Sequence, residues 1–196
     1  MKYLLSKGLI YNISEENILT IYHNGKLIEL TKSESLIWNE CSWKPKEIEK
    51  IHKKNINCFN FSLETLLQKD LIIMSDNELE NDCLFEIVTN SKFKLLNISL
   101  KNKLKSKNYK QIINDTKSYN NLTSFDKMIY NYLKDYNGEI SVSDIILIID
   151  NSLFNIDFFT DGYTSEYIGK AKKSKSSSIV VESILKLLNA KLIYII

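Results

Sequence analysis

The dipeptide Asn24-Gly25 separates two short aliphatic segments, and it restricts the start of the fold more than any other feature of the chain. Both residues tolerate the positive φ angles that a two-residue hairpin turn requires. The sequence therefore predicts a hairpin with strands over residues 18–22 and 26–30. A further short strand is expected over residues 9–13, directly before this hairpin.

A helix signal follows the hairpin. Thr31 and Glu34 have the spacing of a capping box, in which the Thr hydroxyl accepts a hydrogen bond from an early amide and the Glu side chain bonds back to the Thr amide. A second helix is expected to carry Ile48 and Ile51. A third is expected over about residues 60–69, with Phe61, Leu66 and Leu67 facing inward.

A strand over residues 71–74 is expected to close this first part of the chain. The resulting order is three strands, three helices and one strand. That order predicts a small winged-helix-like α+β unit over residues 1–75.

The next part of the chain is acidic. Residues 76–82 are expected to form a linker, because they carry several carboxylates and few apolar residues. Beyond them we expect a hairpin with strands over residues 84–89 and 93–100, and then a helix that includes residues 109–116.

The strongest helical periodicity of the chain lies over residues 125–136, with Thr123 or Ser124 as the cap. The remaining expected elements are a short strand at residues 139–141, a helix capped by Ser141 or Ser143 and running through Ile149, a helix over 179–189 and a strand over 191–196. Residues 83–196 are therefore expected to form a second α+β domain with an insertion at 151–178. A winged helix is one interpretation of this domain.

The positive and negative charges of the chain nearly cancel in total. It has 196 residues with 26 lysines, no arginine and 24 acidic residues, so its formal net charge is +2. This balance does not by itself predict nucleic-acid binding. Lysines cluster near residues 92–110 and 170–175, and we interpret these clusters as solvated faces and loops. Contact with a polyanion or an acidic peptide is the alternative.

The chain carries no membrane or export signal that we recognise. Lys7 interrupts the apolar start before a signal-peptide core could form. Membrane-spanning helices need roughly 20 apolar residues, and no run approaches that length. Cys41, Cys58 and Cys83 lack the spacing of a metal site, so reduced thiols and a cytoplasmic location are expected.

Catalytic motifs are absent from the sequence. No GxGxxG, HExxH or GxSxG pattern occurs, and His23 and His52 are most simply solvated residues. We therefore expect a protein that is not an enzyme, with no cofactor and no metal. The alternative is an enzyme whose site lies in the aromatic insertion, with these residues converging on a pocket: Asp157, Asp161 and Tyr163.

The segment over residues 25–41, GKLIELTKSESLIWNEC, resembles the PqqD-like family. Members of this family bind the leader segments of ribosomally synthesised, modified peptides. The shared pattern is a hairpin strand ending in Glu-Leu, a capping residue, a helix with Ile-Trp, a short second helix and a third helix before Leu-Ile. The resemblance covers about residues 3–75. It departs at residues 42–45, where the family often has a glycine turn.

The resemblance implies a non-catalytic accessory protein that presents a precursor peptide to a separate modifying enzyme. The peptide would add to the third strand and lie against the third helix. The implied peptide-binding residues are Lys26, Leu27, Ile28, Glu29, Leu30, Leu63, Leu66, Leu67 and Lys69. The leucines among them fit the hydrophobic core equally well.

Two further expectations bear on this reading. Replacing Ile28 by proline would remove one amide donor and test whether that amide faces the peptide. A winged-helix DNA-binding regulator is the alternative function, supported by the helical units and the lysine clusters.

Overall fold

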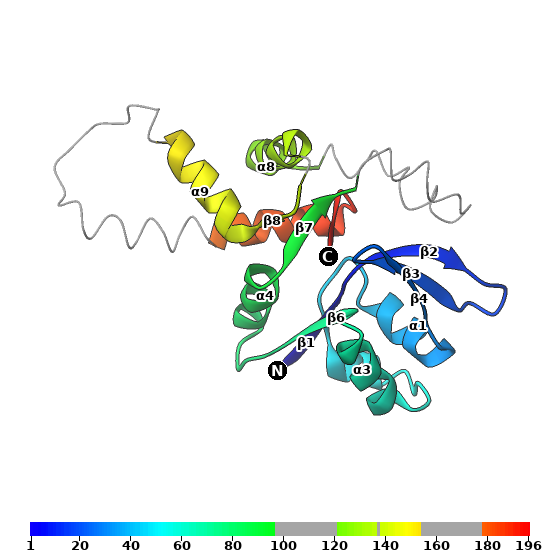
Figure 1. Cartoon of the computed structure of the whole chain (residues 1–196). Helices are drawn as coiled ribbons and strands as arrows, with labels where there is room; N and C mark the ends of the chain where they lie inside the picture. The colour runs from blue at the N-terminus through cyan, green and yellow to red at the C-terminus, as the bar shows by residue number, and fades with distance from the viewer. Residues whose placement is uncertain (97–120, 137, 154–177) are drawn as a thin grey trace.

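The computed structural model describes residues 1–96, 121–136, 138–153 and 178–196 of the chain. Within them the protein is a mixed α+β fold with three small antiparallel sheets (Figure 1). The predicted α+β class is therefore confirmed. The expected helix near residues 109–116 and most of the insertion at 151–178 lie outside the described residues.

The first part of the chain has the predicted strands and helices and two strands that were not predicted, β1 before them and the short β5 between the first two helices. The elements are β1 (Lys2–Ser6), β2 (Leu9–Ile13), β3 (Leu19–His23), β4 (Lys26–Glu29), α1 (Lys32–Glu40), β5 (Lys46–Glu47), α2 (Ile48–His52), α3 (Phe59–Gln68) and β6 (Ile72–Asp76). Thr31 caps α1 in a complete capping box with Glu34, which confirms the prediction. Phe61 is 72% exposed, so its predicted inward orientation is wrong.

The second part runs through α4 (Glu80–Thr89), β7 (Lys92–Leu95), α8 (Ser124–Asp135), β8 (Ile140–Ser141), α9 (Val142–Leu153), a helix over residues 178–189 and β9 (Ile193–Ile195). Thr123 caps α8 in a second capping box, with Asp126. The last strand, β9, pairs with β7 and its residues are buried, which confirms the strand expected over residues 191–196.

The predicted strand over residues 84–89 is wrong, because these residues belong to α4. Cys83, Ile87 and Val88 have helical spacing and are buried together, and acidic residues occupy the first turn, where they favour a helix. The expected linker at 76–82 is reduced to residues 77–79, since Asp76 ends β6 and Glu80 starts α4. A division into two domains at this point stays a prediction.

The same arrangement of elements occurs twice. Unit 1 consists of β1, α1, β5, α2, α3 and β6, and unit 2 of β7, α8, β8, α9, the helix over residues 178–189 and β9. In each unit the first strand lies at the centre of the sheet, antiparallel to the other two. The hairpin sheet β2-β3-β4 is inserted into unit 1 after β1. The expected winged-helix character of both units stays a prediction.

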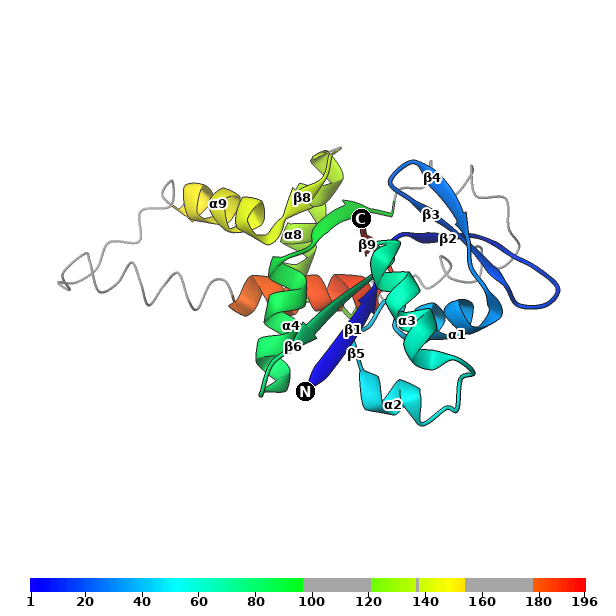
Figure 2. The same cartoon turned by 60° about the horizontal axis from the view of Figure 1, so that its bottom comes forward.

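Strand β1 separates two hydrophobic cores. Leu4 packs in the first core with Trp38 and Leu66, whereas Tyr3 and Leu5 pack in the second core with residues of unit 2. Figure 2 shows β1 and β6 running side by side, with α3 and α4 on either side of them. Because side chains of a strand alternate between its faces, one strand contributes to both cores.

Replacing Leu5 by Ala should therefore destabilise both units together. A buried Leu→Ala change costs about 2–5 kcal/mol of unfolding free energy. Trp38 is buried in the first core, whereas Trp43 packs against Leu96 and Tyr194 of the second part, so the test is made in a Trp43→Phe background, where fluorescence reports on the first core although Leu5 packs in the other. The urea midpoint of Leu5→Ala should fall by the same amount, relative to wild type, whether unfolding is monitored by fluorescence or by circular dichroism. A shift seen only by circular dichroism would show that the cores unfold independently.

Candidate functional site

The turn between β3 and β4 has the geometry that its sequence predicts. Asn24 and Gly25 both have positive φ, at 48° and 78°, and His23 lies directly opposite Lys26. These are the features of a two-residue hairpin with a type I′ turn. The turn holds β4 in register beside β3 and leaves the opposite side of β4 at the edge of the sheet.

Among the described residues, β4 pairs with β3 and with no other strand. Its residues are open to solvent: Lys26 and Glu29 are exposed, and the side chain of Leu27 is 53% exposed. An unpaired edge with an exposed apolar residue is the type of strand to which a foreign chain can add.

The register shows which amides of β4 are available. Leu30 donates its N–H to the carbonyl of Leu19, and hydrogen-bonded pairs alternate with non-bonded pairs along an antiparallel ladder. The backbone groups of Ile28 and Lys26 therefore point toward β3. Those of Leu27 and Glu29 point away from it, toward the open edge.

This corrects the expectation for Ile28. Its amide is used inside the hairpin, so proline at that position would break the hairpin itself. The information was present in the sequence, because the residues that flank a two-residue turn form a hydrogen-bonded pair. Counting by twos from Lys26 assigns Ile28 to the inner ladder.

The predicted peptide-binding residues are distributed over three environments. Lys26, Leu27 and Glu29 are exposed on β4; Ile28 and Leu67 are half-buried against the first core; Leu30, Leu63 and Leu66 are buried inside that core. The buried leucines shape the surface from below but cannot contact a peptide directly.

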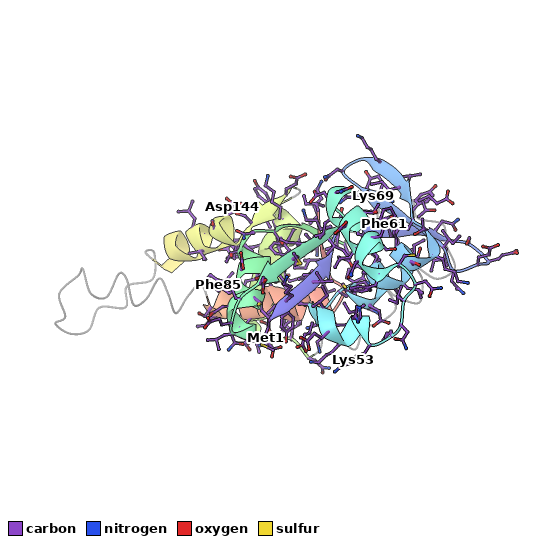
Figure 3. All side chains as sticks on the ribbon, turned by 90° about the horizontal axis from the view of Figure 1, so that it is seen from below. Met1, Lys53, Phe61, Lys69, Phe85 and Asp144 are labelled. Atoms are coloured by element: carbon purple, nitrogen blue, oxygen red, sulfur yellow. The ribbon has the colours of Figure 1, made fainter. Side chains whose placement is uncertain are left out.

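Lys69 has a partner within the protein. Its Nζ lies 2.8 Å from Oε1 of Glu34, whose side chain is almost fully buried and also accepts from the Thr31 amide. This ion pair ties the end of α3 to the start of α1, directly after β4. Figure 3 labels Lys69 and Phe61, which both lie on or next to α3. Lys69 thus fixes the position of α3 relative to α1.

A buried histidine lies at the hairpin turn. The side chain of His23 is 3% exposed, its Nε2 lies 3.4 Å from Oδ2 of Asp70, and its Nδ1 is buried with no hydrogen-bond partner. The interpretation of His23 as a solvated residue is wrong. The alternation of Leu19, Ile21 and His23 along β3 could have shown that all three share the buried face.

Burial lowers the pKa of His23 below its ordinary value, and the hydrogen bond to Asp70 opposes this effect only in part. Lys7 Nζ approaches the same carboxylate to 2.6 Å, and the pKa of Asp70 stays below its ordinary value despite partial burial. The imidazole is therefore neutral at pH 7 next to an ionised Asp70. The three residues connect the β1–β2 junction, the β3–β4 turn and the α3–β6 junction.

The described residues show little further reactive chemistry. Within them no group of three or more His, Cys, Asp or Glu side chains could hold a metal ion. Burial raises the pKa of the Cys41 thiol to about 12, so it is not a thiolate at neutral pH. In this same portion of the chain, no helix combines the length and the apolar character needed to cross a membrane.

Comparisons with protein-family models, with curated proteins and with solved structures found no match to this chain. The site is therefore interpreted from its own geometry.

Protein stability should fall as the pH drops below about 6.5, the ordinary pKa of histidine. The unfolded chain binds a proton at His23 near that pH, whereas the folded chain binds it only at lower pH, so acid favours unfolding. The stability from neutral His23 is complete above pH 6.5 and is lost as the pH falls through the folded-state pKa.

Chemical denaturation between pH 7.5 and 5 measures this effect. His23→Gln should flatten the pH dependence in that window, whatever its effect on stability at pH 7.5. His52→Gln, at an exposed histidine on α2, serves as the matched control and should retain the wild-type slope. Equal slopes for wild type and His23→Gln would contradict the assignment.

Proposed function

We propose that this protein is a non-catalytic accessory protein. It binds the leader of a ribosomally synthesised precursor peptide by β-strand addition to β4 and presents that peptide to a separate modifying enzyme. The observation that carries the proposal is the open edge of β4, with the backbone groups of Leu27 and Glu29 pointing outward. The resemblance of residues 25–41 to the PqqD-like family supports the same edge.

The backbone alone binds a peptide weakly. Leu27 and Glu29 each offer one N–H and one C=O, and a hydrogen bond contributes about 0.5–1.5 kcal/mol net. Four such bonds give about 4 kcal/mol, which corresponds to a dissociation constant of about 1 mM. Side-chain contacts must therefore supply the rest of the affinity and all of the specificity.

Apolar side chains border the edge on both faces of the sheet. On the outer face, Leu27 lies opposite Tyr22 in the β3-β4 register, so the two side chains are neighbours. On the inner face, Ile28 packs against the first core, as does Leu67 of α3. A peptide strand beside β4 would place alternate side chains next to these two groups.

DNA binding receives less support from the same helix. The exposed side chains of α3 are Asn60, Phe61, Glu64 and Gln68. A recognition helix in DNA is expected to carry cationic side chains near the phosphates. Besides the amides of Asn60 and Gln68, α3 exposes an aromatic ring and a carboxylate but no cation, and Lys69 at its end is engaged with Glu34.

Proline at position 27 should weaken peptide binding about tenfold, near the upper end of what one lost hydrogen bond gives. It removes an outward N–H from the centre of the edge and leaves the bonds between β3 and β4 in place, because proline is tolerated on edge strands. Leu27→Val keeps the amide and an apolar side chain, so it should bind within about threefold of wild type. Peptides selected from a random displayed library on the wild-type protein provide the ligand, and fluorescence anisotropy measures the affinity.

Circular dichroism of the two variants verifies that both remain folded. Equal binding by Leu27→Pro and wild type would refute strand addition at β4. Binding of duplex DNA that decreases steeply with salt, in the absence of any selected peptide, would favour the DNA-binding alternative.

A further inference from the structure

A cavity of about 430 Å³ lies between the hairpin turn and unit 2. Tyr22, Asn24 and Gly25 line it on the hairpin side, and Lys94, Glu139 and Tyr194 line it on the side of unit 2. Figures 1 and 2 both show the turn between β3 and β4 next to the sheet of unit 2. The volume is sufficient for a small ligand or for one or two side chains.

Gly8 fixes the position of the hairpin relative to unit 2. Its N–H donates to the carbonyl of Ile195 in β9, at 2.8 Å. Its φ is +85°, and a Cβ atom at this position would lie 2.8 Å from both Ile21 Cγ2 and the carbonyl oxygen of Tyr22. Only glycine fits here, because the backbone conformation and the close approach both exclude a side chain.

The cavity lies on the path of a peptide bound to β4. Gly25 lines the cavity and directly precedes β4, so the open edge begins at the cavity. A peptide that pairs antiparallel with β4 runs toward the hairpin turn. Two residues of strand span about 7 Å, so residues shortly after the paired segment would pass the turn and reach unit 2.

Charge on the unit 2 side favours an anion. Lys94 Nζ lies 3.3 Å from one oxygen of Glu139, and Lys92 Nζ lies 3.8 Å from the other. Lys92 does not line the cavity and also faces Asp144, so Lys94 is the ammonium group of the lining, and it shares its carboxylate partner with Lys92. Lys7 and Asp70 pair with each other near the turn, and the exposed Lys26, directly after Gly25, adds a positive charge at the mouth of the cavity.

Neutral donors complete the lining. Burial raises the pKa of Tyr194 to about 12, so its hydroxyl stays protonated and can donate a hydrogen bond at neutral pH. Tyr22 brings a second phenol from β3. A carboxylate with a lysine ammonium and phenolic donors around it is a well-compensated group.

We propose that this cavity binds an acidic side chain, Asp or Glu, that follows the strand-forming segment of the same peptide. The inference rests on the proposed function, because it takes the peptide at β4 as the occupant. Unit 2 then contacts the peptide through this acidic side chain, in addition to the contact at β4. This second contact supplies the specificity that the four backbone hydrogen bonds of the edge lack.

Peptides selected on the wild-type protein test this inference. They should be enriched in Asp or Glu within a few residues on the carboxyl side of the segment that needs the Leu27 amide. Replacing that acid by Lys should weaken binding at least fivefold. Lys94→Glu should weaken binding of the acidic peptide by a similar factor and should restore binding of the Lys-substituted peptide.

Lys134→Glu is the charge-matched control, since Lys134 is exposed on α8 and does not line the cavity. It should leave both affinities within twofold of wild type. Equal weakening by Lys94→Glu and Lys134→Glu, or the absence of acidic enrichment, would overturn the inference. If the inference fails but the selected peptides still bind the Leu27→Pro variant more weakly than wild type, the proposed function stands. If no selected peptide binds that variant more weakly, both the inference and the proposed function fail.

Discussion

The burial of β1 on both faces is the constraint on which the rest of the structure depends. A strand that supplies Leu4 to one core and Tyr3 and Leu5 to the other cannot shift by one residue, because every side chain would then change core. Its fixed register positions β5, β6 and the inserted sheet β2-β3-β4, which follows β1 after a connection of two residues. The orientation of the open edge therefore derives from a strand that solvent barely reaches.

Local signals in the sequence predicted the elements that have local causes. The Asn24-Gly25 turn, the capping box at Thr31, the cap expected at Thr123 or Ser124 and the helical periodicity of α8 each depend on residues close together in the sequence. β1 lacks the alternation of a half-buried strand because both of its faces are covered. The missed helix α4 and the exposed Phe61 likewise depend on which core lies nearby.

The candidate site was predictable to a similar extent. The resemblance and the turn pointed to β4, and its edge is open among the described residues. Which leucines are covered was not predictable, because Leu30, Leu63 and Leu66 lose their exposure only when α1 and α3 pack beneath the hairpin. The cavity was beyond the reach of sequence reasoning, since Gly25 and Glu139 are far apart in the chain and meet only through the packing of unit 2.

The bond from Gly8 to Ile195 has a consequence for the peptides that such a protein could recognise. It holds the strand edge and the charged wall at one separation, and no larger residue can replace the glycine. A ligand that engages both must then conserve the number of residues between its two contact points, while the identity of the residues between them can vary. Spacing, more than composition, would be the signature by which such ligands are found in a genome.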